Sequence, residues 1–152
     1  MKKMIVTLAI AVTSLGAFAG SPLINSNEDD VNSRVLNAFK TEFNTAKEVE
    51  WTVTSDYYRA TFVYNDKHVF AYYNESGELL GLTRYLSSTD LPISLQTKLK
   101  KNYDGYWISD LFEVAKNDST AYYITLENAD TKLVLRSTDS SNWSAYTKVK
   151  KS

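Results

Sequence analysis

Apolar residues along this chain change their spacing in a way that indicates a helix followed by strands. Over residues 30–43 they recur every three or four positions, which predicts one amphipathic helix. Over the next forty or so residues they recur at every second position, which is typical of half-buried strands. Turn-forming residues separate four such stretches, namely 48–53, 57–62, 68–73 and 79–83. The pattern therefore predicts a helix and a four-stranded antiparallel meander.

The turns also predict how these strands pair. A two-residue turn at Asn65 and Asp66 joins the second stretch to the third. The apolar pairs expected from the turns are Phe62 with Val69, Ala60 with Ala71, Tyr58 with Tyr73, Ala71 with Leu80, and Val69 with Leu82. Each pair brings core residues together, as a correct antiparallel register requires.

The same order of elements then begins again. Ser88-Thr89-Asp90 offers helix caps, and Leu91, Leu95, Leu99 and Tyr103 repeat the helical stripe. If the second repeat has one extra residue in the loop after its helix, Trp51 aligns with Phe112. If it has three more in the next turn, Tyr58 aligns with Tyr122. Two tandem repeats, residues 31–87 and 88–150, therefore form one domain over 31–150. The predicted class is α+β, with one antiparallel sheet and both helices packed on one of its faces.

The N-terminus predicts export. Two lysines, a short apolar stretch and the small residues before position 20 form a secretory signal peptide over residues 1–19, with cleavage expected after Ala19. Residues 20–30 then form a flexible mature N-terminus, in which Asp29 or Asp30 caps the first helix. The expected location is periplasmic or secreted, with no stable membrane insertion after cleavage.

Composition narrows the function further. The chain has 17 basic and 18 acidic residues and no cysteine. Loss of Lys2 and Lys3 with the signal peptide leaves a weakly acidic protein, and nothing supplies the basic stripe that nucleic-acid binding needs. Stability has to come from packing, because no disulfide can form.

The packing residues resemble a known family. The first block is Ala38-Phe39, Phe43, Ala46, Val49 and Trp51, followed by Tyr58-x-Ala60-x-Phe62, Ala71-x-Tyr73 and Gly77-x-Leu79; the second is Leu91-Pro92 with Tyr103-x-Gly105-Tyr106. Together they are similar to the PepSY-like, β-lactamase-inhibitor-like domains of exported bacterial proteins, over residues 31–150. The resemblance implies tandem helix-plus-four-strand repeats. In related inhibitors the open sheet face and its edge loops grip an enzyme, and PepSY domains have been proposed to restrain proteases.

Catalytic chemistry is not indicated. Nucleophilic triads need a base beside Ser, Cys or Thr, and the only histidine, His68, is expected on the outward side of a strand. Glu48 and Glu50 share a strand face, where such pairs are ordinarily solvated. No glycine-rich phosphate loop or metal-ligand cluster occurs, so no enzyme activity, cofactor or metal is predicted.

The sheet face turned away from the helices is the part of the molecule for which the sequence indicates a binding function. It is predicted to present large aromatic and basic side chains, a composition enriched at binding hot spots. The candidate partner-binding residues are Tyr57, Arg59, Phe70, Tyr72, Tyr123, Arg136 and Trp143. Such aromatics also suit strands for their own sake, by covering cross-strand neighbours. Three hypotheses remain open: a module that binds an exported protein, a binder of small ligands or glycans, and a hydrolase built on His68.

Overall fold

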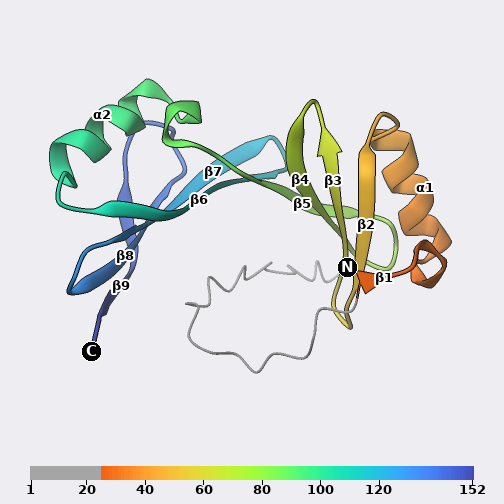
Figure 1. Cartoon of the computed structure of the whole chain (residues 1–152). Coiled ribbons are helices and arrows are strands. Elements are labelled where there is room, and N and C mark those ends of the chain that lie inside the picture. The colour runs from red at the N-terminus through yellow and green to blue at the C-terminus, as the bar shows by residue number, and fades with distance from the viewer. Residues whose placement is uncertain (1–24) are drawn as a thin grey trace, which may run out of the picture.

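The computed structural model describes residues 25–152, which form two helices and one nine-stranded antiparallel sheet (Figure 1). The predicted signal peptide, residues 1–19, lies outside the described residues. Each strand pairs with the next along the chain, so the sheet order is β1 to β9 without a crossover. The elements are β1 (Asn25–Ser26), α1 (Ser33–Glu42), β2 (Lys47–Val53), β3 (Tyr58–Tyr64), β4 (Lys67–Tyr73), β5 (Leu79–Tyr85), α2 (Ile93–Asn102), β6 (Trp107–Lys116), β7 (Ser119–Glu127), β8 (Thr131–Ser137) and β9 (Ser144–Lys150).

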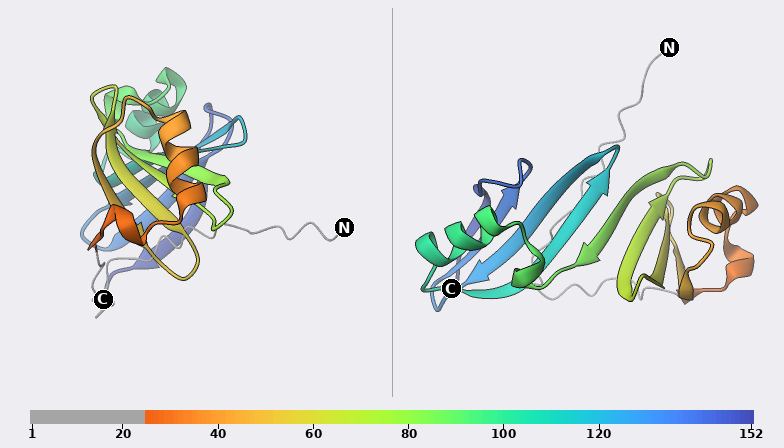
Figure 2. Two further views of the ribbon diagram at one scale, coloured as in Figure 1. Left: turned by 90° about the vertical axis from the view of Figure 1, so that its right-hand side faces the viewer. Right: turned by 90° about the horizontal axis from the view of Figure 1, so that it is seen from above.

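The predicted α+β class and the duplicated unit are confirmed. A helix followed by four strands occurs twice, and the pairing of β5 with β6 joins the two units into one sheet. The helices lie at opposite ends of this twisted sheet (Figure 2). Within 25–152, no helix has the length and apolar character needed to cross a membrane.

One detail of the predicted repeat alignment is wrong. Trp51 pairs with Ala60, and the corresponding pair in the second unit is Leu111 with Ile124. Leu111 is therefore the counterpart of Trp51, and no extra residue follows α2. Phe112, which the alignment placed in the core, lies on the opposite side of the sheet because adjacent strand residues point to opposite faces.

The helix starts also differ from the prediction. The N-cap of α1 is Asn32, whose side-chain oxygen accepts a hydrogen bond from the backbone N–H of Arg34 (2.8 Å). Asp30 caps a preceding 3-10 turn, Glu28–Asp30, by accepting from the backbone N–H of Asn27 (3.2 Å). The nearest short polar side chain before the helix thus takes the cap, and the acidic residues serve the turn that leads into it.

The predicted register is right for β3–β4 and wrong for β4–β5. Phe62 lies opposite Val69, Ala60 opposite Ala71 and Tyr58 opposite Tyr73. On β5, however, Ala71 lies opposite Leu82 and Val69 opposite Arg84. The shift is two residues. The turn places Tyr73 opposite Leu79, one residue beyond the predicted register, and a bulge adds the second: Tyr72 pairs with Gly81, which leaves Leu80 unpaired between them.

Each helix covers its own hydrophobic cluster on the sheet. Under α1 the cluster is aromatic, with Phe39, Phe62 and Trp51 at its centre. Under α2 it is aliphatic, with Leu95, Ile124 and Leu135 fully buried. Both clusters lie on one face: Leu82, which packs on the first, lies opposite Ala115, and alternation along β6 puts Ala115 and Leu111 on the same side.

Tyr73 gives a stability prediction from inside the first cluster. Its side chain is fully buried, and its hydroxyl has no hydrogen-bond partner among residues 25–152. An unsatisfied buried hydroxyl is unfavourable, so Tyr73→Phe is expected to raise the free energy of unfolding by about 1 kcal/mol. Urea unfolding at neutral pH measures the change, with Tyr58→Phe, half-buried on the facing strand, as the control that stays near the parent.

The same residue predicts a pH dependence. Burial raises the pKa of the Tyr73 hydroxyl well above its ordinary value of about 10, and the nearby Glu42 carboxylate adds to the effect. The folded state therefore keeps a proton that the unfolded chain loses, and the contribution of Tyr73 falls as pH rises above about 10. The stability advantage of Tyr73→Phe should grow over that range; an advantage that stays constant would contradict this environment for the hydroxyl.

Candidate functional site

The strand pairings define the face of the sheet that the helices leave uncovered. Thr83 follows Leu82 and so points away from α1; it lies opposite Phe70 on β4 and Val114 on β6. Two residues further along β5, Tyr85 lies opposite Phe112, which in turn lies opposite Tyr123 on β7. The uncovered face is therefore continuous across the junction of the two repeats.

A ladder of aromatic rings runs over this face. Ring centroids are 5.4 Å apart for Tyr57–Tyr72, 5.7 Å for Phe70–Tyr85, 6.5 Å for Tyr85–Phe112, 5.3 Å for Phe112–Tyr123 and 5.6 Å for Tyr123–Tyr146. We call these seven residues the aromatic face. All these pairs meet edge-on except Phe112–Tyr123, whose rings stack at 9°. Partial burial raises the pKa of the Tyr85 and Tyr123 hydroxyls above the ordinary value.

Two arginines lie among these rings. The guanidinium carbon of Arg59 is 5.8 Å from the centroid of Phe70, and that of Arg136 is 5.6 Å from the centroid of Tyr123. Arg59 Nη2 also donates to Thr52 Oγ1 (3.2 Å), which keeps this buried threonine hydrogen-bonded. Cation–π contact with the rings fixes both side chains against the sheet.

A cluster of charged and polar residues borders the uncovered face at the end of the second repeat. Lys151 Nζ donates to Glu127 Oε2 (2.7 Å) and lies 4.9 Å from the centroid of Trp107. The hydrogen bonds from Lys151 and Ser109 lower the pKa of Glu127, whereas burial raises the pKa of nearby Asp110. These charges are largely matched within the group, which sets it apart from the two arginines.

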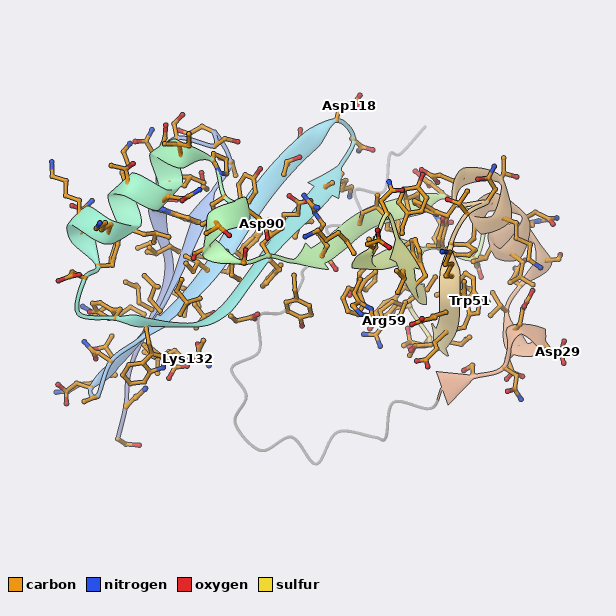
Figure 3. All side chains as sticks on the ribbon, turned by 45° about the horizontal axis from the view of Figure 1, so that its top comes forward. Asp29, Trp51, Arg59, Asp90, Asp118 and Lys132 are labelled. Atoms are coloured by element: carbon orange, nitrogen blue, oxygen red, sulfur yellow. The ribbon has the colours of Figure 1, made fainter. Side chains whose placement is uncertain are left out.

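The structure places six of the seven predicted site residues together. Tyr57, Arg59, Phe70 and Tyr72 lie on the first repeat and Tyr123 and Arg136 on the second; Figure 3 shows Arg59 among its aromatic neighbours. Whether they bind a partner stays a prediction.

The prediction that Trp143 lies on the uncovered face is wrong. Trp143 packs on the second cluster, and its indole Nε1–H donates to the carbonyl oxygen of Leu95 on α2 (3.1 Å). Leu79, also expected on the uncovered face, likewise packs on the first cluster. Leu79 is the first residue of β5, and Trp143 directly precedes β9. Each strand has a bulge shortly after that point, and a bulge reverses the alternation from which the face was predicted.

Sequence reasoning missed three members of the aromatic face. Tyr85 lies two residues beyond the predicted end of its strand, Phe112 was aligned with the core, and Tyr146 sits at the β8–β9 bulge. Tyr85 is the most exposed of them, at 62%. The spacing of Thr83 and Tyr85 after Gly81 was the available signal, since all three share one face.

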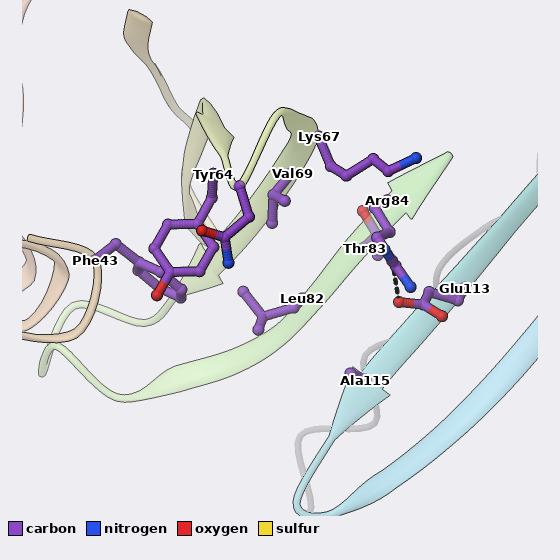
Figure 4. Close-up of a pocket in the computed structure, with 10 residues that line it drawn as sticks. Phe43, Tyr64, Lys67, Val69, Leu82, Thr83, Arg84, Glu113 and Ala115 are labelled. Atoms are coloured by element: carbon purple, nitrogen blue, oxygen red, sulfur yellow. Dashed lines mark hydrogen bonds and ion pairs between the residues drawn. The ribbon is translucent and has the colours of Figure 1, made fainter. Parts of the chain in front are cut away.

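Two clefts open on the helix side. The larger, about 370 Å³, has an apolar lining that includes Phe43, Val69 and Leu82, and the ion pair between Arg84 and Glu113 lies at its edge (Figure 4). The hydrogen bond to Glu113 raises the pKa of Arg84. The smaller cleft, about 240 Å³, runs beside α1.

The residues considered for catalysis do not converge. His68 is exposed and lines neither of these two clefts. Glu48 and Glu50 are exposed, and Glu48 has a left-handed backbone (φ 53°) in a bulge of β2. In the part of the chain that the structure describes, no three His, Asp or Glu side chains are grouped closely enough to hold a metal ion.

Comparison with known proteins identifies the fold. No family model and no curated protein matches the sequence. Among solved structures, a BLIP-like protein from Bacteroides fragilis matches with a TM-score of 0.67 at 17% identity, covering 79% of this chain and 86% of that one. A DUF2874 family protein from Bacteroides ovatus matches with a TM-score of 0.69 at 19% sequence identity, covering 79% of this chain and 87% of that one. A protein from Bacteroides eggerthii, described as a candidate periplasmic protein, matches with a TM-score of 0.67 at 14% sequence identity. The match covers 79% of this chain and 88% of that one.

These matches define the class of protein: an α+β chain with the fold of BLIP-like and DUF2874 proteins. The β-lactamase-inhibitor-like part of the sequence resemblance is thereby supported at the level of fold. The PepSY-like part stays a prediction. At such low identity the likeness extends to architecture alone, and function has to be argued from the surface.

Proposed function

We propose that this chain is a non-enzymatic exported module that binds another exported protein through the aromatic face, in the manner of an inhibitor or a chaperone-like restraint. The observation that carries the proposal is the unbroken series of ring contacts from Phe70 to Tyr146, flanked by the Tyr57–Tyr72 pair, on the side of the sheet that neither helix covers. Tyr85 and Tyr146 are exposed and the other five rings are half-buried. A contiguous aromatic surface that stays partly open to solvent is unusual on a chain that acts alone.

The dimensions of the face support a protein as the partner. From Phe70 on β4 to Tyr146 on β9 the ring contacts cross five strand spacings, or about 24 Å at about 4.8 Å each. A standard protein interface buries about 800 Å² on each partner, a patch about 28 Å across. The side chains of Tyr85 and Tyr146 are 62% and 49% exposed, so their burial by a partner would contribute to the binding free energy.

The ring geometry is less suited to sugars, the alternative partner. A sugar stacks on the open face of a ring, whereas most rings here meet edge-on, and Phe112 and Tyr123 stack on each other. A small-ligand role has one observation of its own: the cleft of about 370 Å³ on the helix side lies within the size range of ligand pockets. A ligand there would leave substitutions on the aromatic face without effect.

The proposed location is the periplasm or the exterior of a bacterium, after cleavage behind Ala19. Support comes from the signal-like sequence of residues 1–19 and from the structural neighbour described as a candidate periplasmic protein. The exported partner would be met in that compartment.

Tyr85→Ala tests the proposed function. We expect it to weaken capture of the partner from an envelope extract of the source organism by at least tenfold, because it removes an exposed ring at the middle of the ladder. The melting temperature, measured in parallel, should change little. Ile93→Ala is the matched control, since Ile93 is 80% exposed at the start of α2. Equal capture by the parent and Tyr85→Ala would contradict the proposal.

A further inference from the structure

Each repeat carries one arginine in the same cross-strand pair of the uncovered face. Arg59 on β3 lies opposite Tyr72 on β4, and Tyr123 on β7 lies opposite Arg136 on β8. Each pair adjoins the corresponding core pair, Ala60 with Ala71 and Ile124 with Leu135. Both repeats therefore carry one Arg–Tyr pair at the same register position on the aromatic face, with the two residue types exchanged between the strands.

Neither arginine is neutralised. Among residues 25–152, no carboxylate forms an ion pair with Arg59 or Arg136, whereas Arg84 pairs with Glu113. The Nε of each is buried and has no hydrogen-bond partner in the described part of the chain. A guanidinium carries five N–H donors, and a buried donor without a partner is costly and rare in native structures. Each guanidinium thus lies close to one ring, with its charge unpaired and its Nε–H unsatisfied.

Building on the proposed function, we propose that the aromatic face binds an acidic protein surface, with one carboxylate group on Arg59 and another on Arg136. Arg59 Nη2 donates to Thr52, and the remaining terminal N–H groups of the two guanidiniums have no partner in the described part of the chain. The fork of these terminal donors matches the two oxygens of a carboxylate. Five strand spacings separate β3 from β8, about 24 Å at about 4.8 Å each. One small acid cannot bridge that distance, but the surface of a folded protein can.

The neighbouring basic residues do not offer the same contact. Lys132 and Lys151 both lie within ion-pair distance of Glu127, at 3.8 and 2.7 Å. Lys116 on β6 is exposed and, within the described residues, has neither an ion-pair partner nor a ring contact, so Arg59 and Arg136 are the unmatched cations that lie against the rings. Acidic polysaccharides also carry carboxylates, but the edge-on rings offer sugars little to stack on, and so a protein is the occupant we infer.

Arginine side-chain NMR tests this inference directly, with poly-L-glutamate as the probe. The chain has four arginines, so the ¹⁵N-labelled protein gives four Nε–H signals. Saturable shifts are expected at Arg59 and Arg136. Arg84, paired with Glu113, should stay unmoved, and Arg34, exposed on α1, reports non-specific ion pairing. An absence of saturable shifts at Arg59 and Arg136, or shifts no larger than those of Arg34, would overturn the inference.

Matched variants separate this contact from general charge attraction. Arg59→Gln and Arg136→Gln should each weaken poly-L-glutamate binding about tenfold, because each loses a charge-assisted pair. Lys101→Gln removes the same charge from the exposed C-terminal end of α2, away from the aromatic face, and should leave affinity unchanged. Tighter binding of alginate than of poly-L-glutamate would assign the face to polysaccharide. Self-association that Arg136→Gln abolishes would assign it to a second copy of the chain. Either result overturns the inference.

The two proposals fail in different ways. If Tyr85→Ala loses the envelope partner while both Arg→Gln variants keep it, the face binds a protein but not through carboxylates. If Tyr85→Ala keeps the partner, the proposed function itself fails, whatever the NMR titration shows.

Discussion

Phe62→Ala is expected to lower the free energy of unfolding by about 4 kcal/mol. Phe62 is only 1% exposed, and its ring centroid lies 5.0 Å from that of Phe39 and 4.9 Å from that of Phe43. Truncation therefore removes buried apolar surface and leaves a cavity between α1 and β3 that rigid rings on both sides cannot fill. Because whole domains are stable by only about 5 to 15 kcal/mol, the variant should be near the limit of folding.

Urea unfolding followed by far-UV circular dichroism measures this loss. Phe70→Ala is the matched control, because Phe70 lies on the paired strand but is only half-buried on the aromatic face. It should lose less than half as much stability. Equal losses for Phe62→Ala and Phe70→Ala would mean that the uncovered face is packed as tightly as the core, which contradicts the proposed role of that face.

Gly77→Ala is expected to cost about 2 to 3 kcal/mol, from two sources. Gly77 has φ +80°, a conformation that strains any residue with a Cβ. That Cβ would also lie 2.8 Å from the backbone carbonyl oxygen of Arg34 on α1, too close for contact. The turn cannot move away easily, since Asn32 Nδ2, at the start of α1, donates to the carbonyl oxygen of Glu75 (3.0 Å).

Gly105→Ala is the control for this substitution. Gly105 lies in the loop after α2, and an added Cβ would meet nothing within 4 Å. It should leave the free energy of unfolding unchanged or raise it slightly, by restricting the unfolded chain. If both variants proved equally stable in thermal unfolding, the close docking of the β4–β5 turn against α1 would be wrong.

The sequence specified the architecture because the period of apolar residues changes with the type of element. The register of β3–β4 was also accessible, since Asn65 and Asp66 both adopt left-handed conformations (φ 49° and 59°) in a two-residue turn. Such a turn fixes which residues face each other. The turn from Asn74 to Glu78 is longer and is followed by a bulge, and a bulge leaves no trace in simple alternation.

The same limit explains the errors at the candidate site. Trp143 has the composition expected of a binding residue, but only the structure shows its indole N–H reaching Leu95 on α2. Phe112 was lost from the face by a one-residue shift, which in a strand exchanges inside for outside. The arginines were found from sequence because the pairings of β3 with β4 and of β7 with β8 contain no bulge, so alternation is reliable there.

Site-specific photocrosslinking tests the central claim, that the uncovered sheet face is the binding surface. A photoreactive phenylalanine analogue is placed at Tyr85 on the aromatic face, or at Ile93 on α2, both of which are well exposed. In the native envelope, adducts with one exported protein are expected from position 85 and not from position 93. Adducts from position 93 alone, or equal adducts from both, would contradict the account.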